Sequence, residues 1–197
     1  MKILRIDSST TGAKSVTREM TGLIMDKLKS DHPDAEIVTR DLGVEPLAHL
    51  NPTTTGAIRM GEDDWTADMK AAAPAEQAIL DEFLSADIVV LGAPMYNFTI
   101  PSALKSWIDR LGVPRVTFRY SEAGPEGLAG GRRIIIASGR GGSYGDDSPA
   151  DYQEGLLKTF FNFIGVEDIT FIRAEGVGMP GGREKAMAAA KEQIAKL

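Results

Sequence analysis

The sequence contains no cysteine and only two histidines, and these shortages narrow the chemistry that the chain can perform. Without cysteine there is no disulfide bridge, no thiolate nucleophile and no cysteine-bound metal. His32 lies beside Pro33 in a predicted turn, and His49 has no evident nucleophile or carboxylate partner. A Ser-His-Asp arrangement stays open, although the Gly-x-Ser-x-Gly signature is missing. The side chains alone therefore provide few candidates for acid–base or nucleophilic catalysis.

Long apolar runs and clusters of basic residues are missing as well. No stretch approaches the roughly 20 apolar residues that cross a membrane, and the N-terminus lacks the charged-then-apolar pattern of a signal peptide. The net charge is −6 without a basic cluster, which disfavours binding to nucleic acid. We therefore expect a cytoplasmic protein with neither a nucleic-acid nor a membrane partner. The acidic run Glu62-Asp63-Asp64 is interpreted as a solvated face, and no metal site is predicted.

The sequence does contain a regular alternation of apolar strands and amphipathic helices. Its 197 residues are expected to form one domain, 1–197. Strands are predicted at 2–6, 36–40, 88–93, 133–137 and 169–172. Helices are predicted at 20–28, 75–83, 104–111, from Ser148-Pro149 to Phe163, and at 186–194. The least periodic stretch, about 42–73, is predicted to be an insertion with short helices, and a hairpin-like excursion is predicted at 116–127.

Five strands that alternate with helices predict a three-layer α/β fold. The sheet should be parallel and doubly wound, with right-handed crossovers and helices on both faces. Five strands favour the flavodoxin-like order 2-1-3-4-5, in which the first and third strands flank the switch point. Ligands bind there, beyond the carboxyl ends of the strands. The loops after the first, third and fourth strands are therefore the candidate site.

The third of these strands continues into an aromatic loop. The strand, Ile88–Ala93, is apolar and mostly β-branched at its start, as expected for a strand covered on both faces. The loop residues Pro94-Met95-Tyr96-Asn97-Phe98 combine flat apolar rings with an amide that both donates and accepts hydrogen bonds. Such a loop suits a flat heterocycle with polar edges. An ordinary strand-to-helix loop with two packed aromatic residues explains this segment at least as well.

The loop after the first strand is rich in hydroxyl groups and leads into a helix. Ser9, Ser15, Val16 and Thr17 lie where free backbone N–H groups and the helix dipole favour an anion such as phosphate. Taken singly, Ser15 and Thr17 are better explained as helix caps. The loop has neither the Gly-Lys-Ser/Thr of a Walker A motif nor the glycines of a Rossmann fingerprint. A mononucleotide with one terminal phosphate therefore fits better than ATP or a dinucleotide.

The loop after the fourth strand is rich in glycine. Gly139, Gly141 and Gly142 would let the backbone approach a ligand closely. Arg140 is a candidate partner for a ring edge or a phosphate. The alternative is a flexible turn that carries a solvent-exposed arginine. A site for a flat ligand with few acid–base groups nearby points to cofactor chemistry.

Together these segments resemble the FMN-dependent NADH-azoreductases, also described as FMN-dependent NADH:quinone oxidoreductases. The resemblance is collinear over nearly the full length. Its most specific elements are Ser9…Ser15-Val16-Thr17, Ala93–Phe98, Val116–Tyr120 with Gly124–Leu128, and Arg140-Gly141-Gly142. The family often has Ser before the Arg-Gly-Gly, whereas this chain has Gly139. A side-chain hydroxyl contact would be lost there, and Ser138 lies one residue too early to replace it.

The resemblance implies a homodimer whose sites hold noncovalent FMN and draw on both subunits. The implied cofactor-binding residues are Ser9, Ser15, Val16, Thr17, Pro94, Met95, Tyr96, Asn97, Phe98, Gly139, Arg140, Gly141 and Gly142. The residues implied to position ligands or to wall the pocket, without acting as acids or bases, are Asn97, Tyr120 and Phe163. For Phe163, a place in the helix core is an equally good interpretation.

The implied reaction is ping-pong: NADH or NADPH reduces the flavin and leaves, and a quinone or azo compound then accepts two electrons. Two other classes of protein stay open. One is a flavodoxin-like FMN electron carrier without substrate turnover of its own. The other is a flavin-free switch domain, which would need an acidic cluster after the first strand, where Asp7 stands alone.

Overall fold

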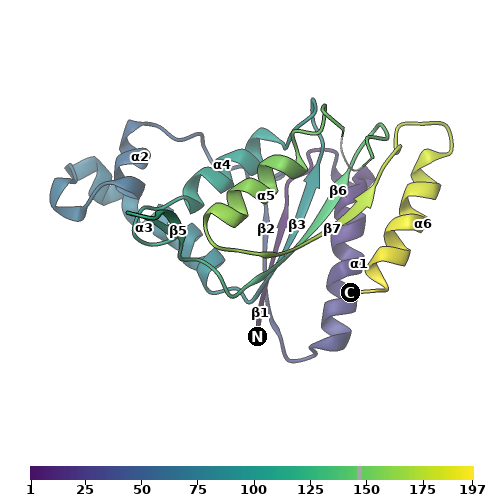
Figure 1. The fold of residues 1–197 in the computed structure, drawn as a ribbon, viewed down its shortest axis with the longest axis horizontal. Coiled ribbons are helices and arrows are strands. Elements are labelled where there is room, and N and C mark those ends of the chain that lie inside the picture. The colour runs from purple at the N-terminus through teal and green to yellow at the C-terminus, as the bar shows by residue number, and fades with distance from the viewer. Residues whose placement is uncertain (146–147) are drawn as a thin grey trace.

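The structure is a computed structural model that describes residues 1–145 and 148–197, and its centre is a parallel sheet (Figure 1). The strands of this sheet are β1 (Lys2–Asp7), β2 (Glu36–Asp41), β3 (Ile88–Pro94), β6 (Arg133–Gly139) and β7 (Asp168–Ala174). They pair in the order β2-β1-β3-β6-β7, and every pair is parallel. The predicted five-stranded parallel sheet is confirmed.

Helices cover both faces of the sheet (Figure 1). The helices are α1 (Val16–Asp31), α2 (Pro52–Arg59), α3 (Ala67–Leu84), α4 (Ser102–Leu111), α5 (Glu154–Phe163) and α6 (Gly182–Ile194). Among them, α2 packs against α3 at the left of Figure 1, away from the sheet. α1 and α6 share one apolar core with residues of the sheet such as Val90 and Ile135. α3, α4 and α5 pack on the opposite face.

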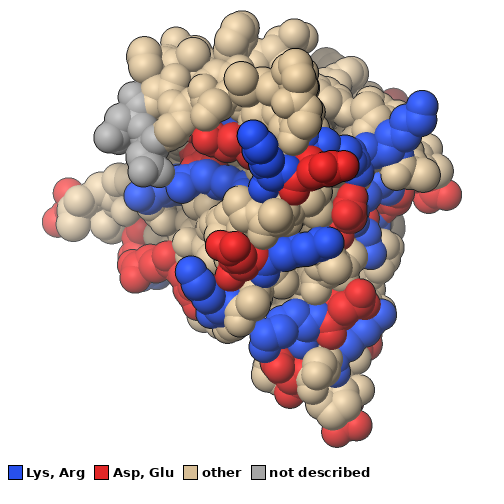
Figure 2. All heavy atoms as spheres, turned by 90° about the vertical axis from the view of Figure 1, so that its right-hand side faces the viewer, with Lys and Arg blue, Asp and Glu red and all other residues tan. Residues whose placement is uncertain are grey.

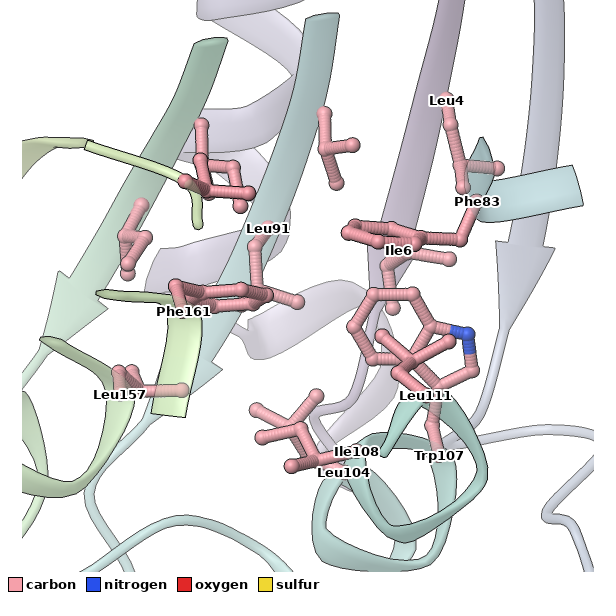
Figure 3. Close-up of a cluster of buried hydrophobic side chains, with 14 of the residues drawn as sticks. Leu4, Ile6, Phe83, Leu91, Leu104, Trp107, Ile108, Leu111, Leu157 and Phe161 are labelled. Carbon is pink, nitrogen blue, oxygen red and sulfur yellow. The ribbon is translucent and has the colours of Figure 1, made fainter. Parts of the chain in front are cut away.

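The core on that opposite face is rich in aromatic rings. Figure 3 shows Phe83, Trp107 and Phe161 packed among aliphatic side chains of the sheet, such as Leu4 and Leu91. The rings of Phe83 and Trp107 are fully buried, with centroids 5.9 Å apart in an edge-on arrangement. Burial from both sides explains why the central strands are nearly continuous apolar runs. This rigid centre holds the carboxyl ends of β1, β3 and β6 beside one another.

The stretch that was predicted as an insertion, 42–73, contains α2, a short 3-10 helix at Glu62–Asp64, and the first residues of α3. α3 begins at Ala67, earlier than the predicted start at residue 75. The side chain of Thr66 caps it, and Pro74 lies inside it. Because proline ordinarily interrupts a helix, the first turns of α3 have no clear signature in the sequence.

α5 begins at Glu154, so the predicted start at Ser148-Pro149 is wrong. Oδ1 of Asp151 accepts hydrogen bonds from the N–H groups of Gln153 and Glu154. This aspartate binds the N–H groups of the N-cap residue Gln153 and of the first helical residue, so the turn that leads into α5 forms at Asp151 and not at Ser148. Tyr152 consequently lies in the preceding turn, where it is exposed.

β4 (Phe118–Ser121) and β5 (Gly124–Gly127) form an antiparallel hairpin outside the main sheet, so the predicted excursion is confirmed.

Over the part of the chain that the structure describes, no helix is long and apolar enough to cross a membrane. Figure 2, which views the side of the molecule that lies at the right of Figure 1, shows acidic and basic side chains interspersed. This face therefore lacks the extended basic patch that nucleic-acid binding needs.

Candidate functional site

A cavity of about 430 Å³ lies at the carboxyl edge of the sheet, where the loops after β1, β3 and β6 meet. It is lined by Ser9, Thr11, Lys14, Ser15, Val16, Thr17, Pro94, Met95, Tyr96, Gly139, Arg140, Gly141, Val177, Gly178 and Arg183. Most of the predicted cofactor-binding residues are therefore brought together. Asn97, Phe98 and Gly142 do not line the cavity itself. Asn97 and Gly142 directly follow the lining residues Tyr96 and Gly141, and Phe98 comes after Asn97.

Buried hydroxyl groups gather at the start of α1. Oγ of Ser15 accepts a hydrogen bond from the N–H of Arg18 at 3.2 Å, which confirms the predicted capping role of this serine. The same Oγ lies 3.1 Å from Oγ1 of Thr17, and both side chains are buried. The first N–H groups of a helix have no acceptor within it. This end of the cavity therefore offers hydroxyl and amide donors to an anion.

Tyr96 joins the aromatic loop to the hydroxyl-rich loop. Its hydroxyl lies 3.1 Å from both N and Oγ1 of Thr10, and 3.4 Å from Oγ of Ser9. Burial by itself raises the pKa of Tyr96. The hydrogen bonds with Ser9 and Thr10 and the charge of Arg18 together outweigh burial, so the pKa of Tyr96 is lower than that of an ordinary tyrosine. Tyr96 thus acts as a hydrogen-bonding anchor in addition to offering a flat ring.

Arg18 supports the backbone of the hydroxyl-rich loop without lining the cavity. Its guanidinium pairs with Asp41 at the end of β2 and donates to the carbonyl oxygen of Ser9 at 2.8 Å. The hydrogen bond from Arg18 holds the pKa of Asp41 below its usual value. Gly43 packs so closely here that a Cβ on it would lie 2.1 Å from the Ser9 carbonyl oxygen. Contacts with Arg18 and Gly43 therefore hold this loop in place.

The aromatic loop reverses direction in a tight, strained turn. The N–H of Tyr96 donates to the carbonyl of Thr99 at 2.8 Å, and the N–H of Thr99 donates back at 3.2 Å. The two residues between them, Asn97 and Phe98, have φ values of +48° and +72°. Positive φ at both central positions is the geometry of a type I′ turn, which asparagine tolerates and phenylalanine rarely adopts. A strained conformation of this kind costs about 1–3 kcal/mol and is typical of functional loops.

The glycine-rich loop packs directly against the other two loops. The N–H of Met95 donates to the carbonyl of Gly139 at 2.7 Å. A Cβ on Gly139 would lie 2.7 Å from Cγ2 of Thr17, whereas a Cβ on Gly141 would meet nothing within 4 Å. The hydroxyl of Ser138 donates to Oε1 of Gln153, so it does not replace a hydroxyl at position 139. The methyl group of Thr17 occupies the space that a serine at position 139 would need.

The side chain of Arg140 does not extend into the cavity, in contrast to the sequence-based suggestion that it meets a ring edge or a phosphate. It is fully buried and pairs with Asp151 at 2.7 Å, Glu154 at 2.5 Å and Glu175 at 2.9 Å. Its Nε also donates to the side chain of Gln153. Arg140 therefore lines the cavity through its backbone, and its guanidinium ties the glycine-rich loop to β7 and α5.

Tyr120 and Phe163 do not reach the cavity of their own chain. The Phe163 ring packs against Phe118, with centroids 4.6 Å apart, and Phe118 packs in turn against Tyr120 at 5.7 Å. The Tyr120 side chain projects from the hairpin with 76% of its surface exposed. Phe163 also packs against the core beneath α5, as the helix-core interpretation expected, and Phe118 and Tyr120 extend from it onto the hairpin.

A fourth loop, between β7 and α6, also lines the cavity and was not predicted. It contributes Val177 and Gly178, and the first turn of α6 adds Arg183, while Thr11 and Lys14 add to the hydroxyl-rich loop. The sequence does carry a signal for this loop. A glycine-rich run, 176–182, follows the fifth strand, and the carboxyl end of that strand lies at the same edge of the sheet.

Two charged groups outside the cavity, Asp7 and Arg110, have structural partners. Asp7 is buried and bonded to Arg5 and Thr21, which disfavours a phosphoacceptor role. A smaller cavity of about 250 Å³ lies among α2, α3 and α4, and at its wall Arg110 is paired with Glu76. Because Arg110 also bonds two backbone carbonyls, it ties the helices together. In residues 1–145 and 148–197, no group of three or more His, Asp and Glu side chains is arranged to hold a metal ion.

Comparison with known proteins agrees with this geometry. A family model described as "Flavodoxin-like fold" matches residues 1–197. The FMN-dependent NADH:quinone oxidoreductase of Azospirillum brasilense is 50% identical, over 98% of this chain and 96% of its own. The chain belongs to the FMN-dependent NADH:quinone oxidoreductase family. The family member from Rhizobium meliloti (strain 1021) is 51% identical, over 100% of this chain and 96% of its own.

Solved structures of the family have the same fold over the whole chain. The azoreductase from Bacillus anthracis str. Sterne has a TM-score of 0.90 at 29% identity and covers 100% of this chain and 97% of its own. The FMN-dependent NADH-azoreductase from Bacillus anthracis str. Ames Ancestor, solved in complex with FMN, has a TM-score of 0.87 at 26% identity, with 100% and 99% covered. The family resemblance seen in the sequence is confirmed.

Proposed function

We propose that the protein is an FMN-dependent NADH:quinone oxidoreductase that also reduces azo compounds, and that FMN occupies the cavity at the carboxyl edge of the sheet. One observation carries this proposal. Buried hydroxyl groups, the N-terminus of α1 and the open backbone of Gly141 converge on that single cavity. Curated relatives that are about half identical over nearly the whole chain bear this enzyme's name.

The residues fit FMN in size and in chemistry. The cavity of about 430 Å³ lies within the range of roughly 300–1,000 Å³ that cofactor sites usually have. A terminal phosphate matches the donors at the start of α1. A flat ring needs a wall without side chains, and the backbone at Gly141 is open in this way. The side chain of Arg140 is not part of this fit, because its charge is taken up by carboxylates.

The proposed contacts follow the order of the loops around the cavity. We assign the phosphate to Ser9 and to Ser15–Thr17. We assign the ribityl chain and one side of the ring to Pro94–Phe98, with Asn97 as a hydrogen-bonding side chain at the cavity's rim. We assign the polar edge of the ring to the backbone of Gly139–Gly142.

The chain itself binds and orients the reactants. When bound, FMN supplies the redox chemistry, namely hydride acceptance from NADH or NADPH and two-electron transfer to a quinone or azo compound. The arrangement that Arg18, Tyr96 and Gly139 impose on the three loops means that little reorganisation is needed when the ring and phosphate bind. No residue is assigned as a nucleophile or as an essential acid or base.

We further propose that the chain is a single domain, 1–197, with an insertion at 42–73, and that it works as a cytoplasmic homodimer. Phe98, Tyr120 and Tyr152 expose 53%, 76% and 64% of their surfaces, and large exposed rings near a site are typical of an interface. Tyr120 and Phe163 do not reach the cavity of their own chain. Their proposed role as pocket walls is therefore assigned to the cavity of the partner protomer.

Steady-state kinetics test the proposed activity. Initial rates are measured with NADH and a water-soluble quinone, each at several concentrations, after FMN has been added in excess. Parallel double-reciprocal lines are expected, because one substrate must leave before the next reacts. A protein that takes up FMN without reducing the quinone would instead be an electron carrier, and the proposed activity would be wrong.

A further inference from the structure

The loop between β7 and α6 is bonded to the glycine-rich loop along its length. The N–H groups of Gly176–Gly178 donate to the carbonyls of residues 140–142 at 2.8 to 3.0 Å. The turn into α6 is equally close-packed, since a Cβ on Gly182 would lie 1.8 Å from the carbonyl oxygen of Gly176. Backbone contacts alone therefore fix where the first turn of α6 stands relative to the cavity.

Arg183, the second residue of α6, reaches from this turn to the hydroxyl end of the cavity. One guanidinium nitrogen donates to the carbonyl oxygen of Lys14 at 2.9 Å, and Lys14 immediately precedes the capping Ser15. The other donates to Glu19 on α1 at 2.8 Å. Both Arg183 and Lys14 line the cavity. The guanidinium thus bridges two helices beside the proposed phosphate position.

The charges at this end of the cavity favour an anion. Of the cations that line the cavity, Arg140 is paired with buried carboxylates, which leaves Arg183 and Lys14. Glu19 neutralises part of the Arg183 charge. Within the described ranges, the Lys14 side chain has neither a hydrogen bond nor an ion pair, and it is exposed. Two cations against one carboxylate leave a net positive charge next to the N-terminus of α1, whose dipole has the same sign. The uncommitted ammonium of Lys14 has a four-carbon stem that can move toward a ligand.

We propose that Arg183 and Lys14 make the cavity select a flavin that carries a terminal phosphate, with the β7–α6 loop as a fourth wall of the FMN site. The inference rests on the proposed function and adds to it. Arg183 has two roles in this selectivity. Its charge attracts the phosphate, and its hydrogen bond to the Lys14 carbonyl holds the turn that positions Ser15. Riboflavin, which has the same ring without the phosphate, should gain nothing from either cation.

Titration of flavin-free protein with FMN and with riboflavin tests this selectivity, with quenching of flavin fluorescence as the readout. Arg183→Gln should weaken FMN binding roughly 3- to 10-fold, a moderate loss because the side chain is 44% exposed. Riboflavin affinity should not change. Added salt should weaken FMN binding less in Arg183→Gln than in the unaltered protein. Arg133→Gln is the matched control, since it removes a charge from the opposite end of β6 and should leave both affinities unchanged.

A second variant keeps the test informative if Arg183→Gln folds poorly. Glu19→Gln leaves both cations and removes the competing carboxylate, so it should tighten FMN binding without changing riboflavin binding. Equal effects of Arg183→Gln on the two flavins, or no effect on either, would overturn the inference while leaving FMN as the cofactor. Failure of the unaltered protein to bind FMN at all would instead overturn the proposed function.

Discussion

The methyl group of Thr17 stands where a side chain on Gly139 would begin. A Cβ on Gly139 would lie 2.7 Å from Cγ2 of Thr17, which is closer than two carbon atoms can approach without movement. Thr17 belongs to the first turn of α1 and Gly139 ends β6, and both line the cavity. The two positions therefore have to be occupied by a compatible pair, and threonine with glycine is the pair in this chain.

Gly139→Ser should consequently damage the protein. The new side chain has to displace Thr17, and overpacking of this kind costs about 1–3 kcal/mol of unfolding free energy. FMN affinity should fall as well, because Thr17 is part of the proposed phosphate site. Urea unfolding and FMN titration measure the two effects.

The double variant Thr17→Ser with Gly139→Ser is the control for this prediction. It removes the obstructing methyl group while keeping both hydroxyls, so it should recover most of the lost stability and affinity. Strictly additive effects of the two substitutions would show that the residues do not interact.

Asn97 is tested best by replacement with glycine. The amide of Asn97 is proposed to contact FMN or its substrate, and Asn97→Gly removes it while accepting the positive φ of the turn. We expect slower flavin reduction or reoxidation in stopped-flow measurements, with little change in stability. Asn97→Ala should show the same kinetic defect plus a loss of about 1 kcal/mol of stability from backbone strain. If Asn97→Gly leaves the rates and the FMN affinity unchanged, Asn97 is not part of the site.

Arg140 should matter more for stability than for contact with the cofactor. Its buried guanidinium faces three carboxylates, and Arg140→Gln would leave these charges without their shared partner. Removing one partner of a buried ionic group costs about 3–5 kcal/mol, which urea unfolding would detect. Arg119→Gln is the control, because the ion pair of Arg119 with Glu126 is exposed on the hairpin and its loss should leave unfolding almost unchanged. Equal stability of the two variants would contradict the role given to Arg140.

Asp41 should make stability depend on pH in the acid range. Arg18 lowers the pKa of Asp41 in the folded protein, below the value of about 3.9 for an unfolded aspartate. The carboxylate therefore stabilises the fold above that unfolded pKa, and the stabilisation is lost as the pH falls through the folded pKa. Asp41→Asn should destabilise the protein by no more than about 1 kcal/mol near neutral pH, because the pair is partly exposed.

Unfolding curves between pH 7 and pH 2.5 measure this difference. The gap between the unaltered protein and Asp41→Asn should be constant near neutrality and should close at the acid end. Asp34→Asn, an exposed change in the turn before β2, should follow the unaltered protein throughout. A gap that stays constant down to pH 2.5 would show that the Arg18–Asp41 pair is not its cause.

The sheet could be predicted from the sequence because its signals are local. Each central strand is a short run of apolar, β-branched residues, and each run is followed by a helical pattern. The first residues of helices were predicted less well where a single residue determines the position at which the helix begins. Pro74 concealed the first turns of α3, and the turn that leads into α5 is formed by Asp151 rather than by Ser148.

The cavity could be predicted because a parallel sheet brings the carboxyl ends of its strands to one edge. What the sequence could not give was the direction of individual side chains. Arg140 looks like a ligand-binding arginine in a glycine-rich loop, but its partners Asp151, Glu154 and Glu175 become its neighbours only in the folded chain. Arg183 was not predicted to line the cavity, because its partner Lys14 lies 169 positions away in the sequence.

The central claim is that FMN in this cavity takes electrons from NADH and passes them to a quinone, and anaerobic single-turnover spectroscopy tests it most directly. Protein reconstituted with FMN is mixed with one equivalent of NADH, and a quinone is added afterwards. We predict that the yellow flavin absorbance bleaches with NADH and returns in full when the quinone is added. A flavin that stays yellow with NADH, or a protein that does not retain FMN, would contradict the account.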